Sequence, residues 1–269
     1  MSSLLRCART TRAFGLPQRA PRPRQPSKTT SLGSNLGLVR SRFSSSNGGF
    51  TPGRHSQLQA NKAVLYTLMG ANVAVFGYAM YLKAQAAQGF PQPFIKFMQN
   101  MTLNLSDFRN GRWWTLLTAN FTHVDIGHIF SNMFTLFFLG RFLAHAPQIT
   151  PGRYLVIAVG SAVSGAAGYL CQQYWKFQAN PRMSDHNRGL GFSGAVMGIS
   201  SVAACMAPTS KVLIYGIVPL PLWAMVAGYA VYDGYYLNSA DTRVGHAGHL
   251  GGLAFGMVYY LARLRGFRV

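Results

Sequence analysis

Long apolar stretches alternate with short polar connections along most of the chain. Residues 189–210, for example, carry no charged side chain. About 20 apolar residues in a helix are enough to cross the hydrocarbon core of a bilayer. On this basis we predict six membrane-spanning helices, at residues 63–82, 126–143, 154–174, 192–207, 222–238 and 246–264. The predicted fold is all-α, a polytopic membrane protein built as a six-helix bundle.

Two prolines set the start of the fifth predicted helix. Pro219 and Pro221 disfavour a helical conformation in the residues that precede them, so this helix is expected to run from about Leu222 to about residue 238. The longest connection between predicted spans, residues 83–125, is rich in aromatic side chains. Aromatic side chains of this kind anchor membrane proteins at the lipid–water interface.

The composition supports a membrane location and changes how the charge is interpreted. Hydrophobic residues make up 49% of the chain and charged residues only 11%, whereas soluble domains are about 25% charged. The formal net charge of +20 would otherwise suggest a nucleic-acid partner. However, ten of the 25 basic residues lie within residues 1–60, and the others stand singly at the ends of apolar stretches. This distribution is typical of membrane proteins, and we expect no nucleic-acid partner.

The first 43 residues have the composition of an organellar targeting segment. They are rich in Arg, Ser and Pro and contain no acidic residue, and an arginine recurs every three residues from Arg6 to Arg12. These features are typical of mitochondrial transit peptides, with a disordered basic tail as the alternative. We therefore divide the chain into a transit peptide (1–43), a polar linker (44–60) and a six-helix membrane domain (61–269).

Polar side chains that could carry chemistry lie at the starts of the even-numbered predicted helices. His128 and Asn132 lie in the first turns of the second helix, Ser193 opens the fourth, and His249 lies in the first turn of the sixth. Because successive spans alternate in direction, these starts lie near one face of the membrane. Polar groups in a bilayer are costly and usually face a cavity or a partner. We therefore expect the four side chains to share a shallow, water-accessible pocket.

The chemistry expected of this pocket is acyl transfer. A serine hydroxyl that is hydrogen-bonded to an imidazole can lose its proton as it attacks a carbonyl carbon. Ser193 and His249 could supply this pair. His128 and Asn132 are four residues apart and therefore lie on one helical face, from which both could donate hydrogen bonds to the oxyanion that forms.

Glycines can bring the fourth and sixth helices close enough for this contact. They recur at four-residue spacing, at Gly194 and Gly198 in the fourth helix and at Gly248, Gly252 and Gly256 in the sixth. Small residues at this spacing let membrane helices approach closely. Each of these features alone is often only a packing feature, and their joint placement at one face favours an active site.

Three stretches of the sequence, GFSGAVMG, HAGHLGGLAFG and HVDIGHIFSN, together resemble the rhomboid intramembrane serine proteases. The resemblance runs from about residue 63 to the C-terminus. It implies a catalytic dyad of Ser193 and His249, with no acidic third member. It also implies an oxyanion site formed by His128, Asn132 and the backbone amide of Ser193.

The resemblance also implies an activity and a location. Rhomboid proteases hydrolyse peptide bonds in or near the transmembrane segments of membrane proteins, within the lipid bilayer and without a cofactor or a metal. Gly252 and Gly256 match packing glycines of the family, and Gly191 and Gly194 flank the nucleophile. The basic leader favours the mitochondrial branch, in the inner membrane. The alternative is a catalytically inactive rhomboid-like protein that binds or escorts membrane clients.

Several other polar residues near the expected pocket need an interpretation. The fifth predicted helix approaches the active face only at its very end, so we expect Asp233 to be a structural carboxylate bonded to loop groups rather than a third catalytic residue. His123 is expected to be a structural residue of the first loop, the connection at residues 83–125. His246 could help to orient water near the pocket. The family often has Trp-Arg in this loop, whereas here Arg112 precedes the tryptophans.

Overall fold

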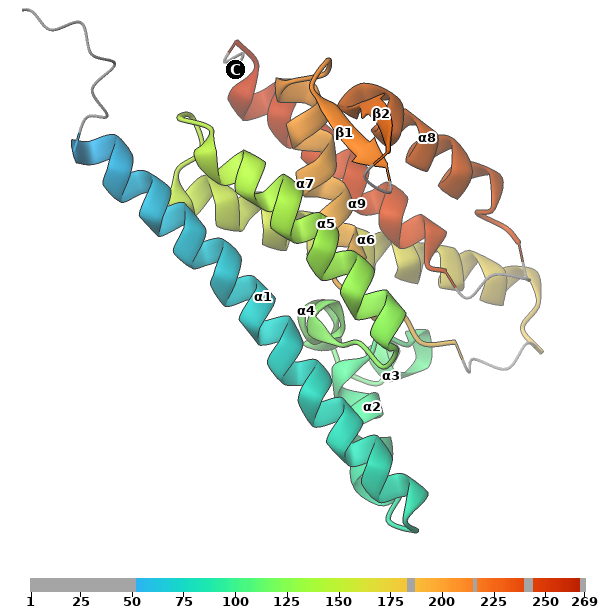
Figure 1. The fold of residues 1–269 in the computed structure, drawn as a ribbon. Coiled ribbons are helices and arrows are strands. Elements are labelled where there is room, and N and C mark those ends of the chain that lie inside the picture. The colour runs from blue at the N-terminus through green and yellow to red at the C-terminus, as the bar shows by residue number, and fades with distance from the viewer. Residues whose placement is uncertain (1–51, 183–186, 215–216, 240–243, 267–269) are drawn as a thin grey trace, which may run out of the picture. The chain divides into compact units, whose positions relative to one another are not determined.

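The structure is a computed structural model that describes residues 52–182, 187–214, 217–239 and 244–266. The expected transit peptide and the first part of the expected linker lie outside these described residues. Six longer helices form a bundle: α1 (Pro52–Ala87), α5 (Ile126–His145), α6 (Pro151–Ala179), α7 (Ser193–Met206), α8 (Leu222–Tyr235) and α9 (His246–Tyr259). Figure 1 shows α1 along one side of this bundle and α8 along the other.

The connections between these helices contain shorter elements. The segment between α1 and α5 holds α2 (Gln92–Met101), α3 (Leu105–Arg109), α4 (Thr115–Thr118) and a short 3₁₀ helix (Ala119–Phe121). Between α7 and α8, the strands β1 (Lys211–Ile214) and β2 (Val218–Pro221) form an antiparallel hairpin. The helix α9 continues as a π-helical turn at Tyr260–Leu264.

Three of the described helices are long and apolar enough to cross a membrane by length and composition, at Gly53–Ala87, Ile126–His145 and Pro151–Ala179. The chain is therefore a multi-pass membrane protein. The helices α7, α8 and α9 have 14 residues each, which corresponds to about 21 Å. This is shorter than the hydrocarbon core of about 30 Å, so the count of six spans stays a prediction.

The observed helix α1 begins earlier than the predicted first span. It starts at Pro52, a residue type that is tolerated in the first helical turn because no helical partner is needed for its nitrogen there. The expected boundary between linker and membrane domain, at residue 60, therefore lies inside a helix. The turn of α1 at this boundary is packed inside the bundle, because the amide of the buried Asn61 donates hydrogen bonds to the carbonyls of Ala144 and Ile149 at 3.0 and 2.7 Å.

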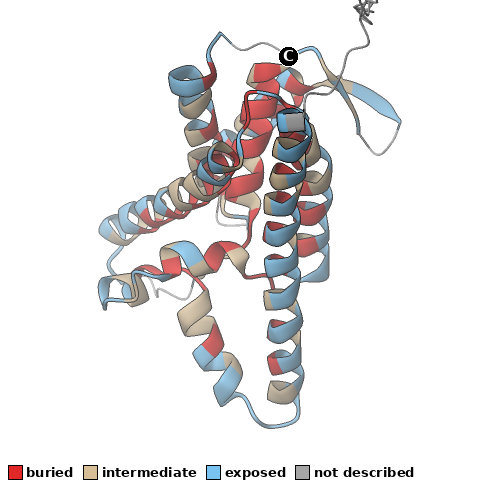
Figure 2. Ribbon diagram, turned by 90° about the vertical axis from the view of Figure 1, so that its left-hand side faces the viewer, coloured by how far each residue is buried: buried red, intermediate tan, exposed pale blue. Residues whose placement is uncertain are grey.

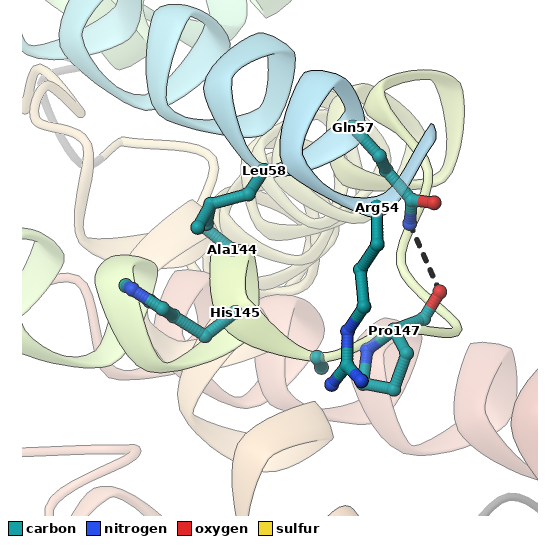
Figure 3. A pocket seen from close by; sticks show the side chains of 7 residues that line it. Arg54, Gln57, Leu58, Ala144, His145 and Pro147 are labelled. Carbon is teal, nitrogen blue, oxygen red and sulfur yellow. Dashed lines mark hydrogen bonds between the residues drawn. The ribbon is translucent and has the colours of Figure 1, made fainter. Parts of the chain in front are cut away.

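A small cavity lies where α1 meets the connection between α5 and α6. It has a volume of about 190 Å³ and is lined by Arg54, Gln57, Leu58, Ala144, His145, Ala146 and Pro147 (Figure 3). The Gln57 amide crosses it to the carbonyl of Pro147 at 2.9 Å. Ala144 lies 16 residues beyond His128 on α5, about 24 Å along the helix axis. The cavity is therefore at the end of α5 opposite the predicted catalytic side chains.

The core of the bundle is built around α7. Eleven of its 14 residues are buried, and it packs against α5, α6, α8 and α9. Figure 2 shows that buried residues gather where the helices face one another, whereas the outer faces are exposed. Large apolar side chains such as Phe130, Phe134 and Tyr235 lie on these exposed faces, as expected for a surface that contacts lipid. Ser193 therefore opens the most enclosed helix of the bundle.

Backbone contacts between glycines join α6, α7 and α9. A Cβ atom at Gly252 would collide with the carbonyl oxygen of Gly194, and one at Gly256 would collide with that of Gly198. Helix α6 belongs to the same contact, because a Cβ atom at Gly165 would lie 2.7 Å from the Gly248 oxygen. The glycines of α7 and α9 were predicted to pack from their spacing, whereas the contact made by α6 was not predicted.

Candidate active site

The hydroxyl of Ser193 and the imidazole of His249 meet at the starts of α7 and α9. Ser193 Oγ lies 2.9 Å from His249 Nε2, a hydrogen-bonding distance. Ser193 is the first residue of α7, and His249 lies in the first turn of α9 with its amide bonded to the Gly245 carbonyl at 3.1 Å. Both side chains are partly exposed, so a substrate can reach them.

The loop before Ser193 is held by the first loop of the protein. The amide of Gly191 donates to the Ala119 carbonyl at 2.9 Å, and the amide of Phe192 donates to His123 Nε2 at 3.3 Å. Gly191 has a φ of +115°, and a Cβ atom there would lie 2.5 Å from the Cε1 atom of His128. Only glycine accommodates both this backbone conformation and this close approach.

His123 connects this loop to Asn132. Its Nε2 atom lies 3.0 Å from the amide nitrogen of Asn132, which donates to it. Because Nε2 accepts hydrogen bonds from Asn132 and from the Phe192 amide, the proton of the neutral ring is assigned to Nδ1. Burial, together with the neighbouring His128, lowers the pKa of His123 to about 4. The ring therefore stays neutral near pH 7, as its role as an acceptor requires.

His128 and Asn132 both contact side chains or backbone of the segments next to the nucleophile: His128 lies against Gly191, and Asn132 against His123. The His128 ring packs directly against Gly191, and its centroid lies 4.9 Å from that of His123. Asp125 caps the N-terminus of α5 by accepting the His128 amide at 2.8 Å, which fixes where the helix begins. Asn132 is buried and contacts His123 through one of its two N–H groups.

Ionic contacts fasten the first loop to the segment that precedes the nucleophile. Arg112 and Arg188 both pair with Asp107, the latter at 2.9 Å between Nη2 and Oδ2. Leu103 and Gly189 exchange two backbone hydrogen bonds, at 2.8 and 2.7 Å. Arg112 thus braces the loop although it does not follow a tryptophan as in the family pattern.

The position of Asp233 corrects the sequence analysis. Its buried carboxylate lies 3.1 and 3.2 Å from His249 Nδ1, through Oδ1 and Oδ2, and 2.6 Å from His246 Nδ1. The expectation of a carboxylate bonded to loop groups is therefore wrong, and a carboxylate lies beside the dyad for which the family resemblance implied no acidic third member. The reason is that α8 ends at Tyr235 rather than near residue 238. Asp233 consequently lies in the last turn, level with the start of α9.

Among the described residues, Asp233, His246 and His249 have ligand atoms close enough together to hold a metal ion. The ligand atoms of Asp233, His246 and His249 all lie within 4.8 Å of one another. However, the separations from the carboxylate are those of hydrogen bonds. A metal would also need deprotonated nitrogens where the imidazoles here donate to the carboxylate. The arrangement therefore favours a hydrogen-bonded chain.

Comparison with known proteins defines the class to which this fold and site belong. The family model described as Rhomboid domain matches residues 110–266, which is more than half of the chain and includes all of the side chains described above from Arg112 onward. The chain belongs to the rhomboid family.

Two named relatives narrow this assignment. The chain is 33% identical over 187 residues to RHOMBOID-like protein 12, mitochondrial, of Arabidopsis thaliana, covering 65% of this chain and 53% of that protein. It is 27% identical over 201 residues to Rhomboid protein 1, mitochondrial, of Saccharomyces cerevisiae, covering 74% of this chain and 52% of that protein. The chain spans about half the length of each relative. With these relatives and its apolar helices, it is a mitochondrial multi-pass membrane protein.

Proposed function

We propose that the protein is an intramembrane serine endopeptidase, which hydrolyses peptide bonds in or near the transmembrane segments of other membrane proteins. The observation that carries this proposal is the 2.9 Å separation of Ser193 Oγ and His249 Nε2. The two side chains come from helix starts held together by glycine contacts, and they are partly exposed. A transmembrane helix of another protein in the mitochondrial inner membrane is the substrate that fits such a site.

In the first half of the reaction, Ser193 Oγ attacks the carbonyl carbon of the substrate peptide bond. Its proton passes to His249 Nε2, and the carbonyl oxygen becomes an oxyanion. The carbon–nitrogen bond then breaks, and His249 returns the proton to the leaving amine. The carboxyl part of the substrate remains bound to Ser193 as an ester.

In the second half, water reaches the ester from the exposed side of the pocket. It transfers one proton to His249 Nε2 as its oxygen attacks the ester carbon. The bond to Ser193 Oγ breaks, and the hydroxyl takes the proton back from His249. The net change is the addition of one water molecule across the peptide bond, and the enzyme is regenerated.

The oxyanion needs hydrogen-bond donors that are in place before it forms. We assign this role to His128, to the second N–H group of Asn132 and to the backbone amide of Ser193. The Ser193 amide lies at the N-terminus of α7, where the helix dipole also favours negative charge. Removing one such donor typically lowers kcat by about 10² to 10³.

Cleavage of a fluorescent transmembrane reporter in liposomes tests the proposal. We expect wild type to cleave it and Ser193→Ala and His249→Ala to be slower by at least about 10³. Ser200→Ala is the matched control, because Ser200 is buried on the same helix and its hydroxyl donates within that helix, to the Val196 carbonyl at 2.7 Å. Equal cleavage by wild type and Ser193→Ala would refute the proposal. Absence of cleavage by wild type would also refute it and would favour a protein that only binds membrane clients.

A further inference from the structure

The carboxylate of Asp233 joins the end of α8 to two histidines of α9. Asp233 and His246 are each only 2% exposed, and the carboxylate contacts the Nδ1 atoms of both His246 and His249. We propose that Asp233 is the positioning residue of the catalytic base, and that His246 in turn holds Asp233. This inference rests on the proposed protease function and extends the dyad to the chain Ser193–His249–Asp233–His246.

The first consequence concerns which nitrogen of His249 carries the proton. A neutral imidazole has one N–H group and one acceptor nitrogen. Both carboxylate oxygens of Asp233 lie near Nδ1, at 3.1 and 3.2 Å, so the proton is held there as a donor. Nε2 then presents its lone pair to the Ser193 hydroxyl, 2.9 Å away. When Nε2 takes the serine proton, the carboxylate also stabilises the positive charge of the ring without accepting a proton itself.

The second consequence concerns how the carboxylate is kept in place. A buried carboxylate is costly unless hydrogen-bond donors surround it. His246 Nδ1 supplies a second donor at 2.6 Å. The His246 ring packs against the neighbouring rings of Tyr232 and Tyr236, with centroid distances of 5.7 and 5.9 Å. His246 therefore holds the carboxylate that faces the base, and its ring also lies beside that of His249, with centroids 6.4 Å apart.

A purely structural role, fastening α8 to α9, explains less of this arrangement. The contact with His246 would be enough to join the two helices. The end of α8 is also held from α6, because the amide of Gln172 donates to the Leu237 carbonyl. A carboxylate needed only for fastening has no reason to place both oxygens against the nitrogen of His249 that lies opposite Ser193.

The test measures kcat and KM of the full-length protein in liposomes with the transmembrane reporter. For Asp233→Asn we expect kcat to fall by about 10² to 10⁴ and KM to change less than twofold, because loss of the equivalent carboxylate costs about 10⁴ in a soluble serine protease. Asp233→Glu should recover part of the rate. The matched control is Tyr235→Phe, since Tyr235 lies in the same helical turn and is 81% exposed. All rates are normalised to the folded fraction from thermal unfolding.

A double-mutant cycle separates positioning from fastening. His246→Gln alone should lower kcat by about tenfold, the scale of an outer hydrogen-bond partner. In the Asp233→Asn background it should have almost no further effect, because its action passes through the carboxylate. Independent, multiplying effects of the two substitutions would contradict this part of the proposal.

The inference and the proposed function fail in different ways. Wild-type kcat in folded Asp233→Asn, beside an inactive Ser193→Ala, would overturn the inference and leave the protease function standing. A rate for Asp233→Glu no better than that for Asp233→Ala would also overturn it. An inactive wild type would instead refute the proposed function and the inference with it.

Discussion

Protonation of His123 should make the protein less stable as the pH falls from about 6.5 to about 4. The side chain is fully buried, and burial together with the nearby His128 ring lowers the pKa of His123 to about 4. The neutral ring is also the form that the loop needs, because Nε2 accepts hydrogen bonds from Asn132 and from the Phe192 amide. A proton on Nε2 would remove both bonds and loosen the segment before Ser193.

The size of the effect follows from the two pKa values of this histidine. In the unfolded chain it titrates near its ordinary value of 6.5, and in the folded protein near 4. Above pH 6.5 both states are neutral, so this residue gives no pH dependence. Between pH 6.5 and pH 4 only the unfolded chain takes up the proton, so the free energy of unfolding falls by about 1.4 kcal/mol per pH unit. The total loss is about 3 kcal/mol, complete below pH 4.

The assay compares wild type with His123→Gln, which keeps an acceptor but cannot be protonated. Reversible unfolding in detergent micelles is measured from about pH 7.5 to about pH 4.5, and the titrating groups that are not coupled to His123 cancel in the difference. We expect the free energy of unfolding of wild type to fall by about 2 to 3 kcal/mol more than that of the variant. Parallel pH profiles would show that His123 is not held neutral by its burial, and would contradict its role as an uncharged hydrogen-bond acceptor.

Two further substitutions test the packing around the site. Gly252→Val places side-chain atoms where the Gly194 carbonyl lies, so α9 must move away. We expect the free energy of unfolding to fall by about 1 to 3 kcal/mol. Reporter cleavage should fall by at least about 10², because His249 shifts with the helix. Gly228→Val, at a position with open space around it, is the control and should change cleavage little. Asp107→Ala should lower the unfolding free energy by about 1 to 2 kcal/mol by releasing both arginines, and an unchanged melting temperature would contradict the brace.

The hydrophobic pattern predicted the starts of five of the six bundle helices to within three residues, whereas α1 begins eleven residues before its predicted start. The predicted starts of α5, α8 and α9 coincide with the observed ones, at Ile126, Leu222 and His246. Each start follows a polar residue, a proline or a glycine, and such residues mark a helix N-terminus in the sequence itself. Because helix direction alternates along the chain, the starts of the even-numbered helices predicted that Ser193 and His249 lie near one membrane face, and the glycine spacing predicted that their helices approach closely.

Helix ends were harder to predict than helix starts, and for this reason the contact of Asp233 with His249 was not predicted. The apolar character continues through Tyr235 and Leu237, so the pattern carries no signal for a helix that ends at Tyr235. An end three residues too late placed Asp233 about one turn too deep. Contacts that depend on side chains from separate segments, such as the one between His123 and Asn132, also lack a local signal. The β1–β2 hairpin was missed because prolines in an apolar stretch suggest only a break in helix.

The most direct test of the central claim is covalent labelling of the nucleophile. A fluorophosphonate probe reacts with a serine only when a neighbouring base takes its proton, which is the role assigned to His249. Labelling of the reconstituted protein, with the modified residue identified by mass spectrometry, should place the probe on Ser193 in wild type. Folded His249→Ala should remain unlabelled. A wild-type protein that takes up no probe, or a His249→Ala variant that labels at the wild-type rate, would contradict the account.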